Sequence, residues 1–257
     1  MTRRNLTRRT FLVLSASAGG TLAGCTTALQ PRPSSLALAA PPVRVSAAPP
    51  PAPAAAAPTV QRTPELDAWF AAREDGGHTI PAVPYWRMDP KFFRQRVVDP
   101  TGEPAGTVVV DTPNRFLYLV EPGGMALRYG VGIGRDGFAW GGEGVIHWRQ
   151  PWPRWKVPAE MVARKPSLEI YSVANGGMAP GVDNPLGARA LYIFQNGQDT
   201  LYRLHGTPEW DSIGGANSSG CVRLVNQDVI DLYDRVPHHA RIVVHQAPLM
   251  AAVGAAA

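Results

Sequence analysis

Between Thr107 and His245 the sequence alternates short apolar, β-branched segments with turn residues, and this pattern limits the fold more than any other feature. Thr107–Asp111 and Arg115–Val120 are separated by Thr112-Pro113-Asn114, and a Pro-Gly-Gly turn precedes the next apolar segment, Ala126–Ile133. Turn signals at such short spacings predict β-hairpins. Because no helical segment separates most of these strands, we predict a mainly β fold, a curved antiparallel β-sandwich with a few short helices. Further strands are predicted at Gly144–Trp148, Ala190–Phe194, Leu201–His205 and Arg241–His245.

Two short helices interrupt the strand pattern. Thr63 followed by Pro64 predicts a helix start, with Gly76-Gly77 beyond its end. The second helix is predicted with Asn226 as its N-cap and one apolar face, formed by Val229, Ile230, Tyr233 and Val236. Cys221 then lies in the turn before this helix.

The segment between Gly144 and Ala190 is too long for a hairpin loop and is rich in proline and tryptophan. It contains Trp148, Trp152 and Trp155. Long ordered loops are often lids over a site, so we predict a lid insertion here, with simple packing as the alternative for each tryptophan.

The first part of the chain predicts export and a tether. A charged start with Arg8-Arg9 precedes a short apolar run that ends Leu22-Ala23-Gly24-Cys25. This ending resembles the lipobox at which bacterial lipoproteins are lipidated, with an ordinary secretory signal as the alternative. Within Ala40–Pro58, fifteen of nineteen residues are Ala or Pro, which predicts an extended spacer that gives reach or is a neutral linker. We divide the chain into an export signal of twin-arginine lipoprotein type (1–24), a lipidated Ala/Pro-rich tether (25–62), an N-terminal flap (63–106), a strand-rich main domain (107–246) and a tail (247–257).

The net charge of +5 does not indicate a nucleic-acid binder. Residues 1–62 carry seven arginines and no acidic residue, so the rest of the chain has 18 Lys and Arg against 20 Asp and Glu. A basic footprint is therefore missing from the folded part, and nucleic acid is not an expected partner. The membrane is expected as a partner only through the lipid on Cys25.

Cys221 is the single cysteine outside the leader, and its surroundings indicate acyl-transfer chemistry. A thiol acts as a nucleophile in its thiolate form, so a catalytic cysteine needs a nearby base or cation. His205 and Arg223 are candidates for these roles. Gly220 leaves space for a substrate carbonyl and for backbone N–H groups that face a developing oxyanion. The alternative is a buried structural cysteine with a packed core histidine.

At these residues the sequence resembles the L,D-transpeptidases, bacterial cell-wall enzymes with a YkuD-type catalytic domain. The matching segments are His205–Thr207, Ile213-Gly214 and Ser218–Arg223. Many members of the family have a second histidine where this chain has Ser219, so the role of that position stays open. The resemblance runs from about Thr107 to Val244 and implies the fold of the L,D-transpeptidase catalytic domain.

The resemblance also implies a set of roles. Cys221 is the expected nucleophile and His205 the proton donor and acceptor, oriented by the backbone carbonyl of Gly206. Gly220 and Cys221 are the expected oxyanion donors. Ser218 and Arg223 are expected to shape the site and bind substrate carboxylates, with Arg223 suited to a two-point contact.

The implied substrate is a peptidoglycan tetrapeptide stem, whose acyl group passes through a thioester to an amine on another stem or on an envelope protein. Two alternatives stay open: a murein L,D-carboxypeptidase or hydrolase with the same site, and a non-catalytic murein-binding lipoprotein. The protein is expected in the periplasm, held to the membrane by the lipid on Cys25. Thr26 after the anchor lacks the aspartate associated with inner-membrane retention and favours the outer membrane.

No cofactor or metal is expected. Gly132–Gly137 fits a dinucleotide-binding glycine pattern, yet no helix pattern follows it, so we interpret it as a loop. His238-His239 and His245 have no carboxylate at ligand spacing and are interpreted as surface or strand-end residues.

Overall fold

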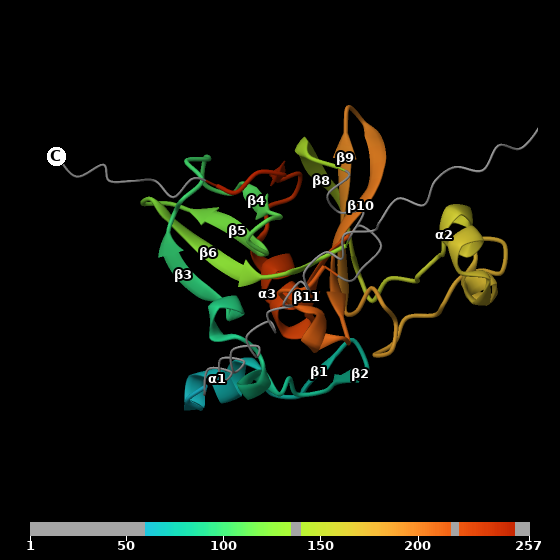
Figure 1. Ribbon diagram of the computed structural model, residues 1–257, viewed down its shortest axis with the longest axis horizontal. Helices are drawn as coiled ribbons and strands as arrows, with labels where there is room; N and C mark the ends of the chain where they lie inside the picture. The colour runs from blue at the N-terminus through green and yellow to red at the C-terminus, as the bar shows by residue number, and fades with distance from the viewer. Residues whose placement is uncertain (1–59, 135–139, 217–220, 250–257) are drawn as a thin grey trace, which may run out of the picture. The chain divides into compact units, whose positions relative to one another are not determined.

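Ten strands form one hydrogen-bonded sheet, which confirms the mainly β fold (Figure 1). The computed structural model describes residues 60–134, 140–216 and 221–249. The strand order is β3-β6-β5-β4-β12-β8-β9-β10-β11-β7. The strands are β3 Gln95–Val98, β4 Val108–Asp111, β5 Phe116–Glu121, β6 Met125–Gly130, β7 Gly132–Ile133, β8 Gly142–Pro151, β9 Arg189–Gln195, β10 Gln198–Thr207, β11 Val222–Val225 and β12 Arg241–His245.

One apolar core joins both halves of this sheet. It contains Leu117 of β5 and Val108 of β4 together with Leu191 of β9 and Leu204 of β10, all fully buried. Residues from the two ends of a flat sheet could not share one core. The sheet is therefore curved, with its two halves packed around common side chains and helix α3, Asn226–Arg235.

Two of the strand pairings are parallel, which the strand pattern did not predict. β12 runs parallel to β4, and β11 runs parallel to β10. Parallel neighbours need a crossover connection rather than a tight turn. β4 and β12 lie far apart in the sequence, and β10 and β11 are consecutive strands joined by a long connection that contains a 3-10 turn, so periodicity within one segment gives no sign of either pairing.

The two predicted helices are present with different ends. Helix α1 spans Pro64–Trp69, and the Thr63 side chain caps it by accepting a hydrogen bond from the Leu66 amide. It ends early because Arg73–Asp75 and His78–Ile80 form a hairpin, β1 and β2. The prediction that Asn226 is an N-cap was wrong. Asn226 is the first residue of α3 and its side chain accepts a hydrogen bond from the Ala188 amide.

The segment before β4 packs on the sheet through its own apolar cluster. Phe70, Tyr85 and Phe93 contact one another and lie in one cluster with Val225 at the start of α3. Strand β3 adds an edge to the sheet beside β6. Two single-turn 3-10 helices lie between these parts, η1 Tyr85–Arg87 and η2 Pro90–Phe92, and a third, η5 Trp210–Ser212, follows β10.

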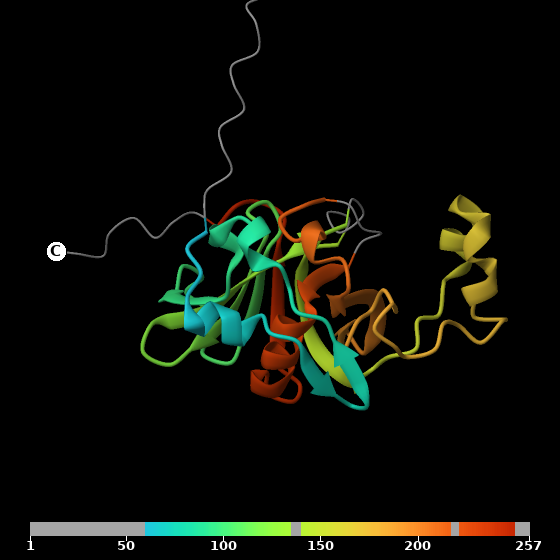
Figure 2. The same ribbon diagram turned by 90° about the horizontal axis from the view of Figure 1, so that it is seen from below.

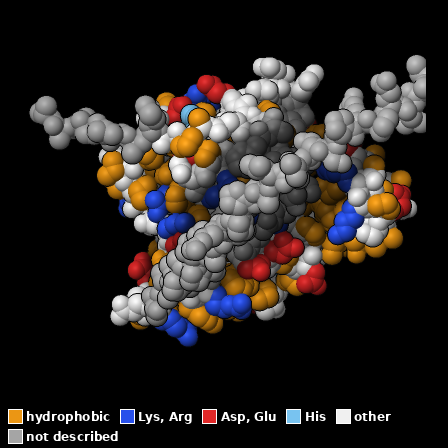
Figure 3. All heavy atoms as spheres, viewed as in Figure 1, with side chains coloured by type: hydrophobic (Ala, Val, Ile, Leu, Met, Phe, Trp, Pro, Cys, Tyr) orange, Lys and Arg blue, Asp and Glu red, His pale blue; other side chains and the backbone are white. Residues whose placement is uncertain are grey.

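The insertion begins after Pro151 and not at Gly144, because β8 continues to Pro151. It carries α2, Ala159–Arg164, and η4, Pro166–Tyr171. Both views show α2 projecting from the sheet on a narrow stalk (Figures 1 and 2). Apolar side chains gather on this projection at the right of Figure 3, and its Ile170 and Val173 are 64% and 62% exposed.

The three tryptophans of this region have different environments. Trp152 is buried and donates a hydrogen bond to Asp75 in β1. Trp155 lies in the stalk and contacts Tyr171. Trp148 belongs to β8 and is 57% exposed on the sheet.

Candidate active site

The parallel pair β10 and β11 brings His205, which lies on β10, next to the strand that Cys221 immediately precedes. His205 of β10 is the register partner of Arg223 of β11. Side chains alternate across a strand, so Cys221, two residues before Arg223, lies on the same face as His205. Residues sixteen apart in sequence are therefore neighbours in the fold.

His205 is held by the backbone that follows it. Its Nδ1 lies 2.6 Å from the carbonyl oxygen of Gly206, the contact that fixes a neutral imidazole with its proton on Nδ1. Nε2 is then the nitrogen able to accept a proton.

Gly206 is required by close packing and not by an unusual backbone angle. A Cβ at this position would lie 2.3 Å from Oδ1 of Asn226 and 2.9 Å from Cγ1 of Val229. A Cβ at Gly187 would lie 2.2 Å from Oδ1 of Asn226 and 2.5 Å from the carbonyl carbon of Gly206. The Asn226 side chain thus lies close to both glycines, and its Oδ1 accepts a hydrogen bond from the Ala188 amide.

Burial keeps His205 uncharged. Burial lowers the pKa of His205 to about 4, because the charged imidazolium loses more hydration free energy than the neutral ring does. Hydrogen bonding to the Gly206 and Pro185 backbone opposes this shift, while repulsion from Arg223 and Arg203 adds to it. At neutral pH His205 is a neutral base.

Cys221 is also uncharged at rest. Burial raises the pKa of its thiol, while a hydrogen bond with the Arg203 backbone and the charges of Arg203 and Arg223 lower it in part. The side chain is of intermediate exposure and is not part of a disulfide. The directions of the two pKa shifts favour a neutral thiol and a neutral imidazole over a preformed thiolate-imidazolium pair.

Arg223 is anchored at one nitrogen and leaves two others for a ligand. It forms an ion pair with Glu209 at 2.8 Å, and its side chain is 8% exposed. Among the described residues, its Nε and second terminal nitrogen are buried without a hydrogen-bond partner. Unpaired buried donors are costly, and a bound anion would satisfy them.

Sequence reasoning missed Arg203. This residue lies two positions before His205 on the same face of β10, and its guanidinium pairs with Asp199 through two contacts of 2.7 Å. Its charge reaches both His205 and Cys221. The strand alternation of Arg203 and His205 was the signal that could have found it. Glu209, four residues after His205, was missed too.

Several predicted site residues lie outside the described residues. These are Ser218, Ser219 and Gly220 at the site and Cys25 in the leader. In the part of the chain that the structure describes, no group of three or more His, Cys, Asp or Glu side chains is placed to hold a metal ion. Over the same residues, no helix combines the length and apolar character needed to cross a bilayer.

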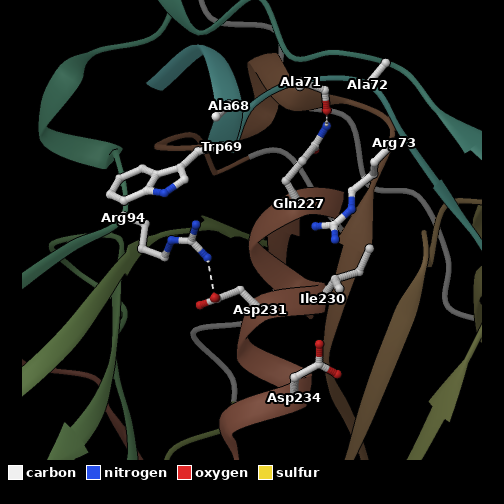
Figure 4. Close-up of a pocket in the computed structure, with 10 residues that line it drawn as sticks. All are labelled: Ala68, Trp69, Ala71, Ala72, Arg73, Arg94, Gln227, Ile230, Asp231 and Asp234. Atoms are coloured by element: carbon white, nitrogen blue, oxygen red, sulfur yellow. Dashed lines mark hydrogen bonds and ion pairs between the residues drawn. The ribbon is translucent and has the colours of Figure 1, made fainter. Parts of the chain in front are cut away.

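A cavity of about 350 Å³ lies away from the thiol, between α1 and α3 (Figure 4). Arg94 enters it beside the Trp69 ring and pairs with Asp231 at 2.7 Å. Neither Cys221 nor His205 lines this cavity. It marks the contact between the N-terminal segment and α3 rather than the site of the predicted chemistry.

Comparison with known proteins decides the family. Residues 105–244 match YkuD, the L,D-transpeptidase catalytic domain, over more than half of the chain. The chain belongs to the L,D-transpeptidase family. The match begins just before β4 and ends within β12, so it covers the sheet apart from β3 and the last residue of β12, together with the insertion and α3.

Relatives of this chain include two Escherichia coli proteins. The chain is 30% identical over 165 residues to the probable L,D-transpeptidase YbiS, covering 61% of this chain and 50% of the relative. It is 31% identical over 149 residues to the probable L,D-transpeptidase ErfK/SrfK, covering 55% and 44%. It thus spans about half the length of these relatives.

A solved Brucella melitensis structure described as a probable carnitine operon oxidoreductase is 45% identical. It covers 60% of this chain and 94% of its own, with a TM-score of 0.43.

Proposed function

We propose that this protein is a peptidoglycan L,D-transpeptidase that acts through a thioester on Cys221. The observation that supports the proposal is the pairing of β10 with β11, in which the carbonyl-anchored His205 is the register partner of Arg223, two residues after Cys221. The substrate is a tetrapeptide stem, and the group expelled is its terminal D-alanine.

In the first half-reaction His205 Nε2 takes the thiol proton while sulfur attacks the stem carbonyl. The C–S bond forms, the C–N bond to D-alanine breaks, and the imidazolium returns its proton to the leaving amine. Because the pKa of His205 is lowered to about 4, the charged imidazolium readily gives up that proton. Backbone N–H groups of Gly220 and Cys221 are the proposed donors to the oxyanion.

In the second half-reaction an amine attacks the thioester. His205 accepts the amine proton, the new C–N bond forms as the C–S bond breaks, and the proton returns to Cys221. The amine belongs to a second stem peptide or to an envelope protein.

Arg223 is the proposed binder of a stem carboxylate. Its two unpaired nitrogens suit a two-point contact, and Glu209 holds the guanidinium in place. Ser218 is proposed to shape the same site.

The rest of the chain is proposed to place this site at the cell wall. In this proposal the export signal delivers the chain to the periplasm, lipid on Cys25 anchors it, with the outer membrane favoured, and the Ala/Pro tract gives reach. The projecting insertion is proposed to act as a lid over the donor stem.

Acylation by a carbapenem tests the nucleophile, because the strained lactam carbonyl can replace the donor carbonyl. The test uses the full-length protein with Cys25→Ser, in which Cys221 is the single thiol. We expect one adduct by intact-protein mass spectrometry and none in the further variant Cys221→Ala, with the melting temperature as the folding control. An adduct on Cys221→Ala would contradict the thioester mechanism and favour the murein-binding alternative.

Muropeptide analysis separates transfer from hydrolysis. After incubation with tetrapeptide-containing murein we expect new cross-linked or amine-exchanged products by mass spectrometry. Release of D-alanine without any amine adduct would show that water is the acceptor, which is the carboxypeptidase alternative.

A further inference from the structure

An aromatic row crosses the outer face of the sheet and leads to the nucleophile. Trp148 of β8 is the register partner of Tyr192 of β9, and Tyr192 is the partner of Arg203 of β10. Partner side chains project to the same face. The next strand along is preceded by Cys221, whose thiol shares a hydrogen bond with the Arg203 backbone.

The side chains of the row stack on one another, so Trp148 covers one face of the Tyr192 ring. The Trp148 and Tyr192 rings lie with centroids 5.5 Å apart and an interplanar angle of 28°. The guanidinium carbon of Arg203 lies over the Tyr192 ring, 4.4 Å from the ring centroid. Arg203 is itself fixed by its paired contacts to Asp199. Tyr192 is half-buried, whereas the Trp148 indole is 57% exposed, so the open end of the row is a tryptophan face.

The indole ring of Trp148 keeps a large apolar surface in contact with water, which is unfavourable unless a ligand covers it. Its neighbours are polar and charged: the row's own Arg203–Asp199 pair, and His147 and Arg149 beside a cavity of about 310 Å³ that Trp148 also lines. An apolar ring face bordered by hydrogen-bonding groups matches a pyranose ring. Such a sugar has an apolar C–H face and hydroxyl groups around its edge.

The distance along the row fits a sugar that carries a peptide stem. Trp148 and Cys221 are separated by three inter-strand steps in the order β8-β9-β10-β11. At about 4.8 Å a step this is roughly 14 Å. Three extended residues reach at most about 11 Å, and the link to the sugar adds the remainder. A sugar at Trp148 would therefore let its stem reach the thiol in an extended form.

We propose that the exposed ring face of Trp148, supported from behind by Tyr192, is a stacking platform for a sugar ring of the glycan strand to which the donor stem is attached. This inference rests on the proposed function for the identity of the substrate. It assigns recognition of the glycan to the sheet and recognition of the peptide to the residues near Cys221.

Substrate comparison tests the platform. The ratio of kcat/KM for a disaccharide-tetrapeptide over the sugar-free tetrapeptide is measured for the wild type, Trp148→Ala and Trp148→Phe. An aromatic contact contributes about 0.5–1.5 kcal/mol, so Trp148→Ala should lower the ratio by about threefold to tenfold. Trp148→Phe should retain part of it. The matched control is Trp86→Ala, because Trp86 is 47% exposed but lies in the N-terminal segment.

A binding experiment keeps the platform testable without turnover. Ligand-observed NMR measures the affinity of full-length Cys221→Ala protein for a peptide-free oligosaccharide of alternating N-acetylglucosamine and N-acetylmuramic acid. We expect binding that Trp148→Ala weakens by about threefold to tenfold and Trp86→Ala leaves unchanged.

The outcomes separate the two proposals. If the wild type and Trp148→Ala turn over both substrates with the same ratio of kcat/KM values, the platform is overturned and the transpeptidase proposal stands. If oligosaccharide binding depends on Trp148 but the wild-type protein turns over neither substrate, the platform is supported and the transpeptidase proposal is overturned. Absence of any oligosaccharide binding by the Cys221→Ala protein would also overturn the platform.

Discussion

The two parallel strand pairs use the same backbone arrangement for different purposes. In β4–β12 three of the four register pairs join the buried apolar residues Val108–Val110 and Ile242–Val244, and the fourth joins Asp111 to His245 at the strand ends. In β10–β11 the buried residues include His205, Thr207 and Arg223. The first pair stabilises the fold through apolar burial. The second gives up part of that stabilisation, because buried polar groups lose their hydration, and gains a reactive pair with shifted pKa values.

The comparison predicts that mutations in the two pairs have separable effects, and the largest is at His205. His205→Ala should slow carbapenem acylation by about 100-fold or more, the usual contribution of a positioned base. Intact-protein mass spectrometry over time measures the rate, and thermal melting checks the fold. Equal rates with and without His205 would overturn its role as the base.

The counterpart in the other pair is Ile242→Ala. Ile242 is fully buried in the main core, so we expect a loss of about 3 kcal/mol in the free energy of unfolding. Chemical denaturation measures this loss. The acylation rate of the folded protein should stay near the wild-type value, and a fall comparable to that of His205→Ala would show that the two pairs are not independent.

Gly206→Ala should affect both properties, because it lies where packing and chemistry meet. An added Cβ would approach Asn226 Oδ1 to 2.3 Å, so the backbone must shift. We expect about 2 kcal/mol of destabilisation, with slower acylation because the carbonyl that orients His205 moves. Gly181→Ala is the control, since a Cβ there meets no atom within 4 Å.

Asp228, in the first turn of α3, makes the stability of the fold depend on pH. Burial raises the pKa of this carboxyl to about 7, from an unfolded value near 3.8, so the folded state holds its proton more tightly. That contribution to stability is complete below about pH 4 and is lost as the pH rises to about 7. Buried His205 acts in the opposite direction, because its stabilising contribution is lost as the pH falls from 6.5 towards 4.

Asp228→Asn separates these opposing terms. The difference in unfolding free energy between Asp228→Asn and the wild type should grow in favour of the variant from pH 4 to pH 7, by less than about 1.4 kcal/mol per pH unit. Denaturation curves at several pH values measure it, with the exposed Asp234→Asn as the control. A constant difference across this range would show that Asp228 is ionised throughout.

The sequence by itself determined the local elements and the reactive residue types. Strand β12 begins and ends where the pattern predicts, and β4 and β5 each differ by one residue at their ends. Thr63 caps α1 as its residue type predicts, because capping depends only on neighbours in the chain. The spacing of His205 and Cys221 indicated the family, which residues 105–244 confirm.

The tertiary structure decided which strands became neighbours and what those neighbours do. Parallel pairing, the placement of Arg203 beside the thiol and the packing of Asn226 against two glycines all depend on residues that are distant in sequence. The exposure of Trp148 was also invisible, because a tryptophan in a strand pattern is equally compatible with the core. Periodicity shows which residues of one strand share a face, whereas the order of strands in the sheet decides what that face contacts.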